Sequence, residues 1–345
     1  MKLLKFILFP LVPVYLLVIK LRNLFFDKNI FKSKSVNARI ISVGNITTGG
    51  SGKTPLVIYL SELLKNNGKK VGVLSRGYGR KSKGYKLVSD GKEIFTSVQD
   101  SGDEIYHTVL ECKIPAAVCE DRVHGAEKLI RETGVDHIVL DDAFQHRWVK
   151  RDLDIVIVAQ RFLLSSEFWI DNLLPAGDLR ESYSALKRAD VIILNRKFAY
   201  KQDIPDKKKK FFTNKNIFTA YYRAISFVDI VKKDEYRLEE FEGQKSLVVS
   251  GVANPVSFLN VLSQNHVDTS NKLIFKDHKK YTFREVQRIR KSFYATNSHS
   301  VVTTEKDAVK LMNFAKEFDD IDIFFLKIKL ELDDAESFNK IILNE

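Results

Sequence analysis

The sequence is poor in cysteine and lacks the motifs that identify several common classes of binding protein. Its 345 residues include only two cysteines, Cys112 and Cys119, whose number and spacing fit neither a disulfide framework nor a metal site. Such cysteine usage is typical of a reducing cytosol. No zinc-finger, RNA-recognition or basic-zipper pattern is present, so no nucleic-acid partner is predicted. The Asn-Lys-x-Asp signature of guanine-nucleotide switches is also missing, as are internal repeats.

Positive charge is in excess over negative charge. The formal net charge is +12 at pH 7, which indicates an anionic partner such as a phosphorylated substrate or an anionic lipid. Hydrophobic residues make up 44% of the chain and charged residues 29%, as in ordinary globular proteins. A chain of 345 residues is long for one compact domain, so we expect two.

The N-terminal segment departs from the globular pattern. An uncharged, mostly apolar run covers residues 6–19 and is flanked by Lys2, Lys5, Lys20 and Arg22. It falls short of the ~20 residues needed to span a bilayer, and no small-residue cleavage site of a signal peptide follows it. We predict that residues 1–27 form a helix lying on a membrane surface, with the basic flanks at anionic head groups. A helix packed against the folded domain is the alternative.

Short apolar runs alternate with helix-like runs through the first two-thirds of the chain. The expected strands cover residues 40–42, 71–74, 116–118, 137–140, 155–158 and 191–194, and the expected helices cover 55–65, 103–111, 122–132 and 182–188. This alternation predicts an α/β fold, with a mostly parallel sheet covered by helices on both faces.

A change of pattern near residue 225 predicts a domain boundary. Two β-rich runs and a charged stretch lie there, and further strands are expected at 247–250, 273–275, 301–303 and 323–326. We therefore expect a first domain over residues 28–224 and a second, smaller α/β domain over residues 225–345.

A glycine-rich loop lies between the first apolar run and the first helix-like run. Backbone N–H groups of such a loop curl round an oxyanion, and the helix N-terminus adds its dipole. Lys53 is placed to reach the terminal phosphates of a nucleotide, and the hydroxyl of Thr54 to bind Mg²⁺. The strict Gly-x4-Gly-Lys-[Ser/Thr] pattern is not met, because Thr47 occupies the position of the first glycine. The predicted nucleotide-binding residues are Thr47, Thr48, Gly49, Gly50, Ser51, Gly52, Lys53 and Thr54.

Two carboxylates follow the apolar run at residues 137–140. Asp141 and Asp142 stand at the carboxyl end of this expected strand. In a nucleotide-binding α/β fold that end of the strand lies beside the phosphate loop, where an aspartate can hold Mg²⁺. Which of the two binds the metal is left open.

Several motifs together resemble those of one family. They are residues 44–55, 75–80, 102–104, 121–122, 140–146, 173–181, 277–278 and 303–308. In content and order they are similar to the lipid A 4′-kinase family (tetraacyldisaccharide 4′-kinase), over residues 40–310. Two positions depart from the family pattern, Ala143 and Ile105, and neither removes a functional group. The resemblance implies a P-loop kinase domain.

The resemblance also implies a reaction and a location. The γ-phosphate of ATP would pass to the 4′-hydroxyl of a lipid-linked glucosamine disaccharide 1-phosphate, to give lipid IVA. The site would be the cytoplasmic face of the inner membrane of a Gram-negative bacterium, with no obligatory protein partner. Asp103 matches the family's general base, which accepts the hydroxyl proton, and His278 of the second domain matches the histidine paired with it.

Further roles follow from the matched motifs. Guanidinium groups suit phosphate oxygens, so Arg122 and Arg180 are expected to bind the substrate, together with Arg76 and Tyr78. Which of these arginines contact ATP and which contact the lipid is left open. Glu181 is expected to reach the metal through water. Two other functions fit the phosphate loop alone: a soluble P-loop kinase of a small molecule, and a non-catalytic membrane-associated P-loop ATPase. The non-catalytic ATPase would not need Asp103 and His278.

Overall fold

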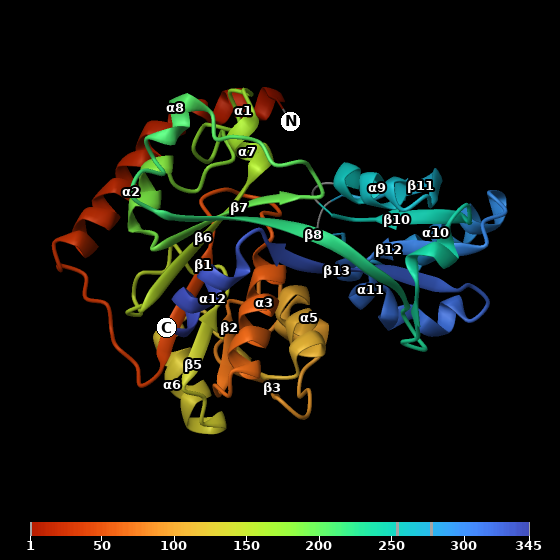
Figure 1. Cartoon of the computed structure of the whole chain (residues 1–345), viewed down its shortest axis with the longest axis horizontal. Coiled ribbons are helices and arrows are strands. Elements are labelled where there is room, and N and C mark those ends of the chain that lie inside the picture. Colours follow the sequence, from red (N-terminus) through yellow and green to blue (C-terminus); the bar gives the residue numbers. More distant parts are fainter. Residues whose placement is uncertain (1, 253–254, 277–278, 345) are drawn as a thin grey trace. The chain divides into compact units, whose positions relative to one another are not determined.

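The computed structural model describes residues 2–252, 255–276 and 279–344, which divide into two compact units (Figure 1). Unit 1 consists of Met1–Tyr221 together with Leu332–Glu345, and unit 2 of Tyr222–Glu331. The two long strands β8 and β13 each carry the chain across a unit boundary.

The core of unit 1 is a mostly parallel sheet. Its strands follow the order β8-β7-β6-β1-β5-β2-β4-β3, and only β3 runs antiparallel to its neighbour. β2 and β6 are buried along their whole length, because helices cover both faces of the sheet. The fold predicted from the sequence is therefore confirmed. The strands are β1 (Arg39–Gly44), β2 (Val71–Ser75), β3 (Lys86–Asp90), β4 (Pro115–Val118), β5 (His137–Leu140), β6 (Leu153–Ala159), β7 (Val191–Lys197) and β8 (Asn216–Asp229).

Helices of unit 1 mostly connect successive parallel strands, as in βαβ units. The carboxylate of Asp121 caps α6 by accepting hydrogen bonds from the backbone N–H groups of Val123 and His124. Both cysteines are buried and unpaired. The helix expected over 182–188 is a 3₁₀ helix, η2 (Tyr183–Arg188). The helices after β1 are α3 (Lys53–Asn66), α4 (Val98–Ser101), α5 (Asp103–Cys112), α6 (Arg122–Thr133), α7 (Gln160–Leu164) and α8 (Asp206–Lys209).

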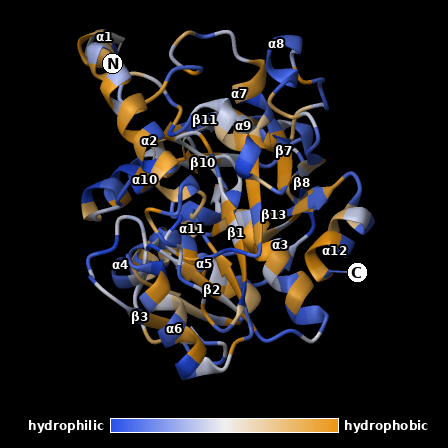
Figure 2. Ribbon diagram, turned by 90° about the vertical axis from the view of Figure 1, so that its left-hand side faces the viewer, coloured by the Kyte–Doolittle hydropathy of each residue, from blue (hydrophilic) through white to orange (hydrophobic). Residues whose placement is uncertain are grey.

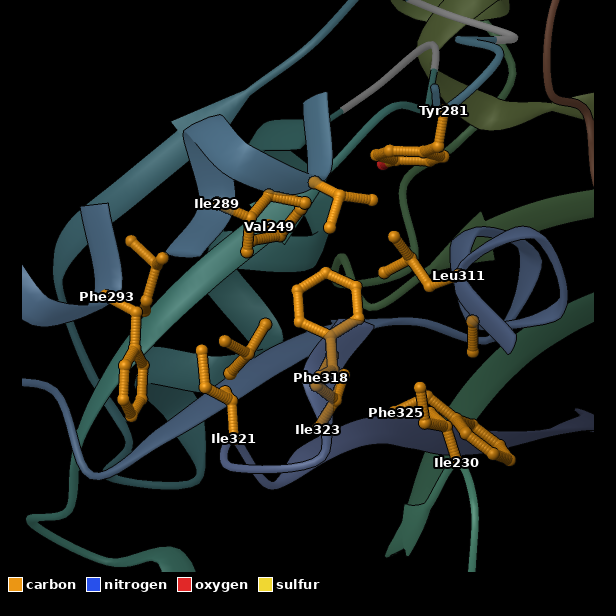
Figure 3. Packing of buried hydrophobic residues seen from close by; sticks show 14 of the residues in the cluster. Ile230, Val249, Tyr281, Ile289, Phe293, Leu311, Phe318, Ile321, Ile323 and Phe325 are labelled. Carbon is orange, nitrogen blue, oxygen red and sulfur yellow. The ribbon is translucent and has the colours of Figure 1, made fainter. Parts of the chain in front are cut away.

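Unit 2 has its own hydrophobic core. Apolar side chains from its strands, from α10 and from η4 pack together, among them Val249, Ile289, Phe318 and Phe325 (Figure 3). Its strands follow the order β11-β10-β12-β13, and all these neighbours are parallel. The elements are β9 (Glu235–Tyr236), η3 (Leu238–Phe241), β10 (Lys245–Ser250), α9 (Pro255–Gln264), β11 (Asp268–Ile274), α10 (Phe283–Ala295), β12 (Ser300–Thr304), α11 (Glu305–Leu311), η4 (Met312–Phe318) and β13 (Ile323–Leu332).

The last helix, α12 (Ala335–Leu343), belongs to unit 1, whereas the sequence grouped it with the second domain. Phe338 on this helix is fully buried and lies 6.0 Å, centroid to centroid, from the ring of Tyr59 on α3. The hydroxyl of Tyr59 also donates to Oδ1 of Asn339 at 2.8 Å. The helix joins unit 1 because these partners, remote in sequence, bury its apolar face.

The N-terminal segment forms α1 (Lys2–Leu8), a short 3₁₀ turn η1 (Phe9–Leu11) and α2 (Val12–Asp27). Pro10 and Pro13 occupy the first turns of η1 and α2, where a backbone N–H is not needed. The helical run Lys5–Asp27 has 23 residues, so its length and apolar composition would allow it to cross a membrane. It exceeds the apolar run found in the sequence because it continues through polar residues. Figure 2 shows the hydrophobic residues along α1 and α2.

Candidate active site

The phosphate loop joins β1 to α3 and is held by hydrogen bonds from two asparagines. Gly49 and Gly52 have φ angles of 85° and 104°, a region in which glycine avoids the strain of a Cβ atom. Nδ2 of Asn45 donates to Oγ of Ser51 at 2.9 Å, and Nδ2 of Asn195 donates to the Ser51 carbonyl at 2.9 Å. Asn195 follows the apolar part of β7. The loop that begins at the end of β1 is therefore also held by a residue near the carboxyl end of β7. Sequence analysis did not single out either asparagine.

The first half of the loop pairs with residues 178–181, called the 178–181 segment below. Thr47 forms an antiparallel bridge with Leu179, and the N–H of Thr48 donates to the carbonyl of Asp178 at 2.7 Å. The N–H of Arg180 donates to the carbonyl of Ile46 at 2.8 Å. This extended pairing explains why threonine stands where the strict motif has glycine, since a β-branched residue suits extended backbone.

Asp142 is held by two cations. Nη1 of Arg180 donates to Oδ1 and Oδ2 of Asp142 at 2.8 and 2.9 Å, and Nζ of Lys53 lies 3.5 Å from Oδ1. Burial acts to raise the pKa of Asp142, but Lys53 and Arg180 outweigh burial and hold this pKa below its ordinary value. Asp142 is therefore ionised and already paired at neutral pH.

Asp141 lies in a different environment. Oδ2 accepts a hydrogen bond from Oγ of Ser75 at 3.1 Å, while Oδ1 is buried and has no hydrogen-bond partner among the described residues. Burial, followed by the negative charges of Glu104 and Asp142, raises the pKa of Asp141 to about 7. A buried carboxylate oxygen without a partner beside another carboxylate suits a divalent cation, so these residues fit Mg²⁺.

Asp103 is the first residue of α5, which lies beside α3 in the same unit (Figure 1). Its side chain is half-buried. α3 begins at Lys53. The two proposed catalytic residues of this unit, Lys53 and Asp103, are therefore the first residues of two neighbouring helices. His278 lies outside the described residues.

The motif at residues 303–308 has a structural role within unit 2. Asp307 is completely buried, and its Oδ2 accepts hydrogen bonds from the N–H of Gly251 at 2.7 Å and from the hydroxyl of Thr304 at 2.8 Å. These bonds tie the end of β10 to the start of α11. Asp307 therefore stabilises the unit on which His278 is carried.

A family model, LpxK, described as tetraacyldisaccharide-1-P 4′-kinase, matches residues 4–345. The chain belongs to this family. A tetraacyldisaccharide 4′-kinase of Halothermothrix orenii is 36% identical over 98% of this chain and 93% of its own length. One of Chlorobaculum parvum is 38% identical over 88% of this chain and 83% of its own length. The crystal structure of LpxK from Aquifex aeolicus in complex with ATP superposes with a TM-score of 0.79, at 31% identity and covering 99% of both chains.

Arg122 is a buried residue of unit 1. It is only 2% exposed, and its contact with the substrate stays a prediction. Nη1 donates to the carbonyl of Cys119 at 2.8 Å and Nη2 to the carbonyl of Asp141 at 3.3 Å. Burial lowers the pKa of Arg122 to about 10, so the group stays charged at neutral pH. Arg122 holds the backbone at the end of β5 and thereby positions Asp141.

Glu181 is likewise 2% exposed, and its carboxylate accepts hydrogen bonds at 2.9 Å from both terminal nitrogens of Arg188. Nδ2 of Asn23 donates to Oε2 at 2.9 Å. Glu181 therefore joins α2 to η2, and its contact with a metal through water stays a prediction. Arg76 and Tyr78 remain accessible, and Tyr78 is 73% exposed.

The N-terminal helices contact the 178–181 segment directly. The hydroxyl of Tyr15 donates to the carbonyl of Arg180 at 3.0 Å, and Nζ of Lys5 lies 3.2 Å from Oδ1 of Asp178. Because Arg180 binds Asp142 and Asp178 binds the phosphate loop, the N-terminal helices take part in positioning the site.

Replacing Tyr15 by phenylalanine is expected to lower kcat about 3- to 10-fold, the effect of losing one neutral hydrogen bond. The loss should appear with detergent-dispersed substrate, because it arises at Arg180 and not at a membrane. Tyr200→Phe is the matched control, since Tyr200 is 88% exposed. Equal kcat values for the Tyr15 variant and the wild type would show that this contact does not position the site.

Proposed function

We propose that this chain transfers the γ-phosphate of ATP to the 4′-hydroxyl of a tetraacyldisaccharide 1-phosphate. The observation that carries the proposal is the phosphate loop, with Lys53 beside the Asp141–Asp142 pair, in a chain that belongs to the LpxK family over nearly its whole length. The net charge of +12 suits an acceptor that is itself a phosphorylated lipid.

In the proposed mechanism, the 4′-oxygen attacks the γ-phosphorus as the bond to the β,γ-bridging oxygen breaks. Asp103 accepts the hydroxyl proton, and His278 orients this carboxylate. Lys53 stabilises the negative charge that develops on the transferred phosphoryl group and on ADP. Arg76 and Tyr78, which are accessible, are proposed to bind the acceptor. Arg180 acts through Asp142.

Asp141 and Thr54 are the residues proposed to hold Mg²⁺, with Asp142 beside them. The support is the buried, unpartnered Oδ1 of Asp141. When bound, the ion would neutralise charge on the β- and γ-phosphate oxygens. Lys53 and Arg180 hold the pKa of Asp142 below its ordinary value, so Asp142 is ionised at neutral pH.

The direct test is an assay with labelled ATP, Mg²⁺ and tetraacyldisaccharide 1-phosphate in detergent. A labelled lipid should form together with ADP, and chelation of the metal should stop its formation. Release of labelled inorganic phosphate at a rate independent of the lipid would instead identify an ATPase and refute the proposal.

We further propose that α1 and α2 bind the cytoplasmic face of the inner membrane. One face of α2 packs on unit 1 through Val12, Tyr15 and Leu16. The other face is apolar yet exposed, and an exposed apolar patch of this extent is typical of a membrane or protein interface. Phe9 continues the patch onto a loop, because its ring centroid lies 5.6 Å from that of Phe168. The exposed residues are Phe6, Ile7, Phe9, Leu11, Val14, Leu17, Val18, Leu21, Leu24 and Phe168.

This arrangement supports a helix lying in the plane of the membrane surface. A helix crossing the membrane would remove the polar contacts of Arg22 and Asn23 from the folded unit, whereas both bind it here. The side that packs on the protein and the side that meets lipid are then opposite faces of one helix.

Serine substitutions at Ile7, Leu17 and Val18 should each weaken binding to vesicles roughly 10-fold, through loss of buried apolar area. Co-sedimentation with anionic vesicles measures this. kcat on detergent-dispersed substrate should stay near the wild-type value, because none of the three contacts the 178–181 segment. Val231→Ser, which changes a residue 60% exposed in unit 2, is the control. Unchanged sedimentation of all three variants would assign membrane binding to another surface.

A further inference from the structure

Two basic side chains outside the family motifs lie against the exposed part of the phosphate loop. A Cβ atom built on Gly50 would lie 3.9 Å from Nζ of Lys197, and one built on Gly49 would lie 3.8 Å from Nη2 of Arg161. Gly49 and Gly50 are themselves exposed. Lys197 ends β7 and Arg161 belongs to α7, so two separate elements bring cations to the same stretch of loop.

The backbone at Lys197 is strained and held in place. Its φ angle is 54°, in the left-handed region that residues with a Cβ atom seldom adopt. The N–H of Lys197 donates to Oδ1 of Asn195 at 2.8 Å, and Nδ2 of Asn195 donates to the Ser51 carbonyl at 2.9 Å. One buried amide therefore ties Lys197 to the loop that its amine approaches. Strain that the surroundings maintain in this way is characteristic of functional positions.

The electrostatics of the pair is unfavourable without an anion. Within residues 2–252, 255–276 and 279–344, neither Lys197 nor Arg161 forms an ion pair with an acidic side chain. Burial, followed by repulsion from Arg161, lowers the pKa of Lys197 to about 8. Asp178 is the acidic group that acts on Arg161, and burial lowers the pKa of Arg161 as well. Two neighbouring cations of this kind would both be stabilised by a shared anion.

We propose that Lys197 and Arg161 form a phosphate-binding subsite on the Gly49–Gly50 part of the loop. The subsite would hold oxygens of a phosphate group in addition to those bound by Lys53 and the loop N–H groups. This inference rests on the proposed function, which supplies two phosphates: those of the nucleotide and the 1-phosphate of the lipid. Contact with the phosphate loop itself favours the nucleotide.

Lys197→Met keeps the length of the side chain and removes its charge. ADP binding, measured by calorimetry on the full chain, should weaken roughly 10- to 100-fold, as for the loss of a charge-assisted hydrogen bond. Lys197→Arg should retain most of the affinity. Lys207→Met is the matched control, because it removes the same charge from an exposed residue of α8.

Two further readouts separate binding from a structural role. The ligand-free Lys197→Met variant should unfold at a temperature no lower than the wild type, because repulsion with Arg161 is relieved. A structural role predicts a lower temperature. In the wild type, anion binding favours the charged lysine, so ADP affinity should be highest below about pH 8 and fall as the pH rises further. Lys197→Arg should remove this dependence, because arginine stays charged.

The outcomes distinguish the sources of the phosphate. Weaker ADP binding assigns the subsite to the nucleotide, whereas a raised KM for the lipid with unchanged ADP affinity assigns it to the 1-phosphate. If neither quantity changes in Lys197→Met or in Arg161→Met, the inference is overturned. ADP binding by the wild type needs no acceptor, so a failed lipid assay with intact ADP affinity would refute only the proposed function.

Discussion

Replacing Asp103 by alanine is expected to lower kcat roughly 10²- to 10⁴-fold, the usual contribution of a general base. The KM for ATP should change little, because Asp103 acts on the acceptor hydroxyl and not on the nucleotide. Steady-state kinetics with both substrates varied separates the two parameters. His278→Ala should also lower kcat, and the double variant should lose less than the product of the two single losses, because paired residues act as a unit.

Asp103→Asn is the control for a purely structural role. Asp103 is the first residue of α5, where an acidic side chain also stabilises the helix terminus. Asparagine can still accept hydrogen bonds there but cannot take up the proton. Near-normal kcat in Asp103→Asn would show that the side chain serves the helix and not the reaction. A rise in KM alone would make Asp103 a binding residue.

Replacing Lys53 by alanine should lower kcat at least ~10²-fold, the scale of one electrostatic contact made in the transition state. Lys53 begins α3, and its Nζ lies 3.5 Å from Oδ1 of Asp142. The variant therefore loses a contact to the transferred phosphoryl group and leaves Asp142 with Arg180 as its remaining cation.

Lys69→Ala, which changes an exposed lysine just beyond α3, provides the comparison with equal net charge. Both proteins should unfold at similar temperatures, so that a low kcat in the Lys53 variant reports chemistry. If the two variants show the same kcat as the wild type, the loop before α3 does not hold the reacting phosphate.

Short-range sequence patterns were sufficient for most strands of the sheet in unit 1, but not for β3. The apolar runs at 71–74 and 155–158 are β2 and β6, because strands buried on both faces need nearly continuous apolar residues. The strand–loop–helix context of the phosphate loop is likewise local, so it could be recognised although Thr47 departs from the strict motif. Thr47 itself was explained only by its bridge to Leu179, far along the chain.

Roles that depend on distant partners could not be predicted. The burial of Arg122 against Asp141, and of Glu181 against Arg188 and Asn23, was not predicted from the sequence. Sequence analysis also left Asp141 and Asp142 equivalent. Arg180 and Lys53 bind Asp142, while Oδ1 of Asp141 is left without a partner among the described residues.

The sequence by itself determined the α/β fold, the position of the phosphate loop, the family resemblance and the apolar N-terminal helix. These depend on residues adjacent in the chain or on an ordered set of motifs. The tertiary structure decided which charges are paired and which are left unpaired, the assignment of α12 to unit 1, and the approach of Lys197 to Gly50. The physical reason is that pairing, burial and pKa depend on the distances between atoms far apart in sequence, which folding alone sets.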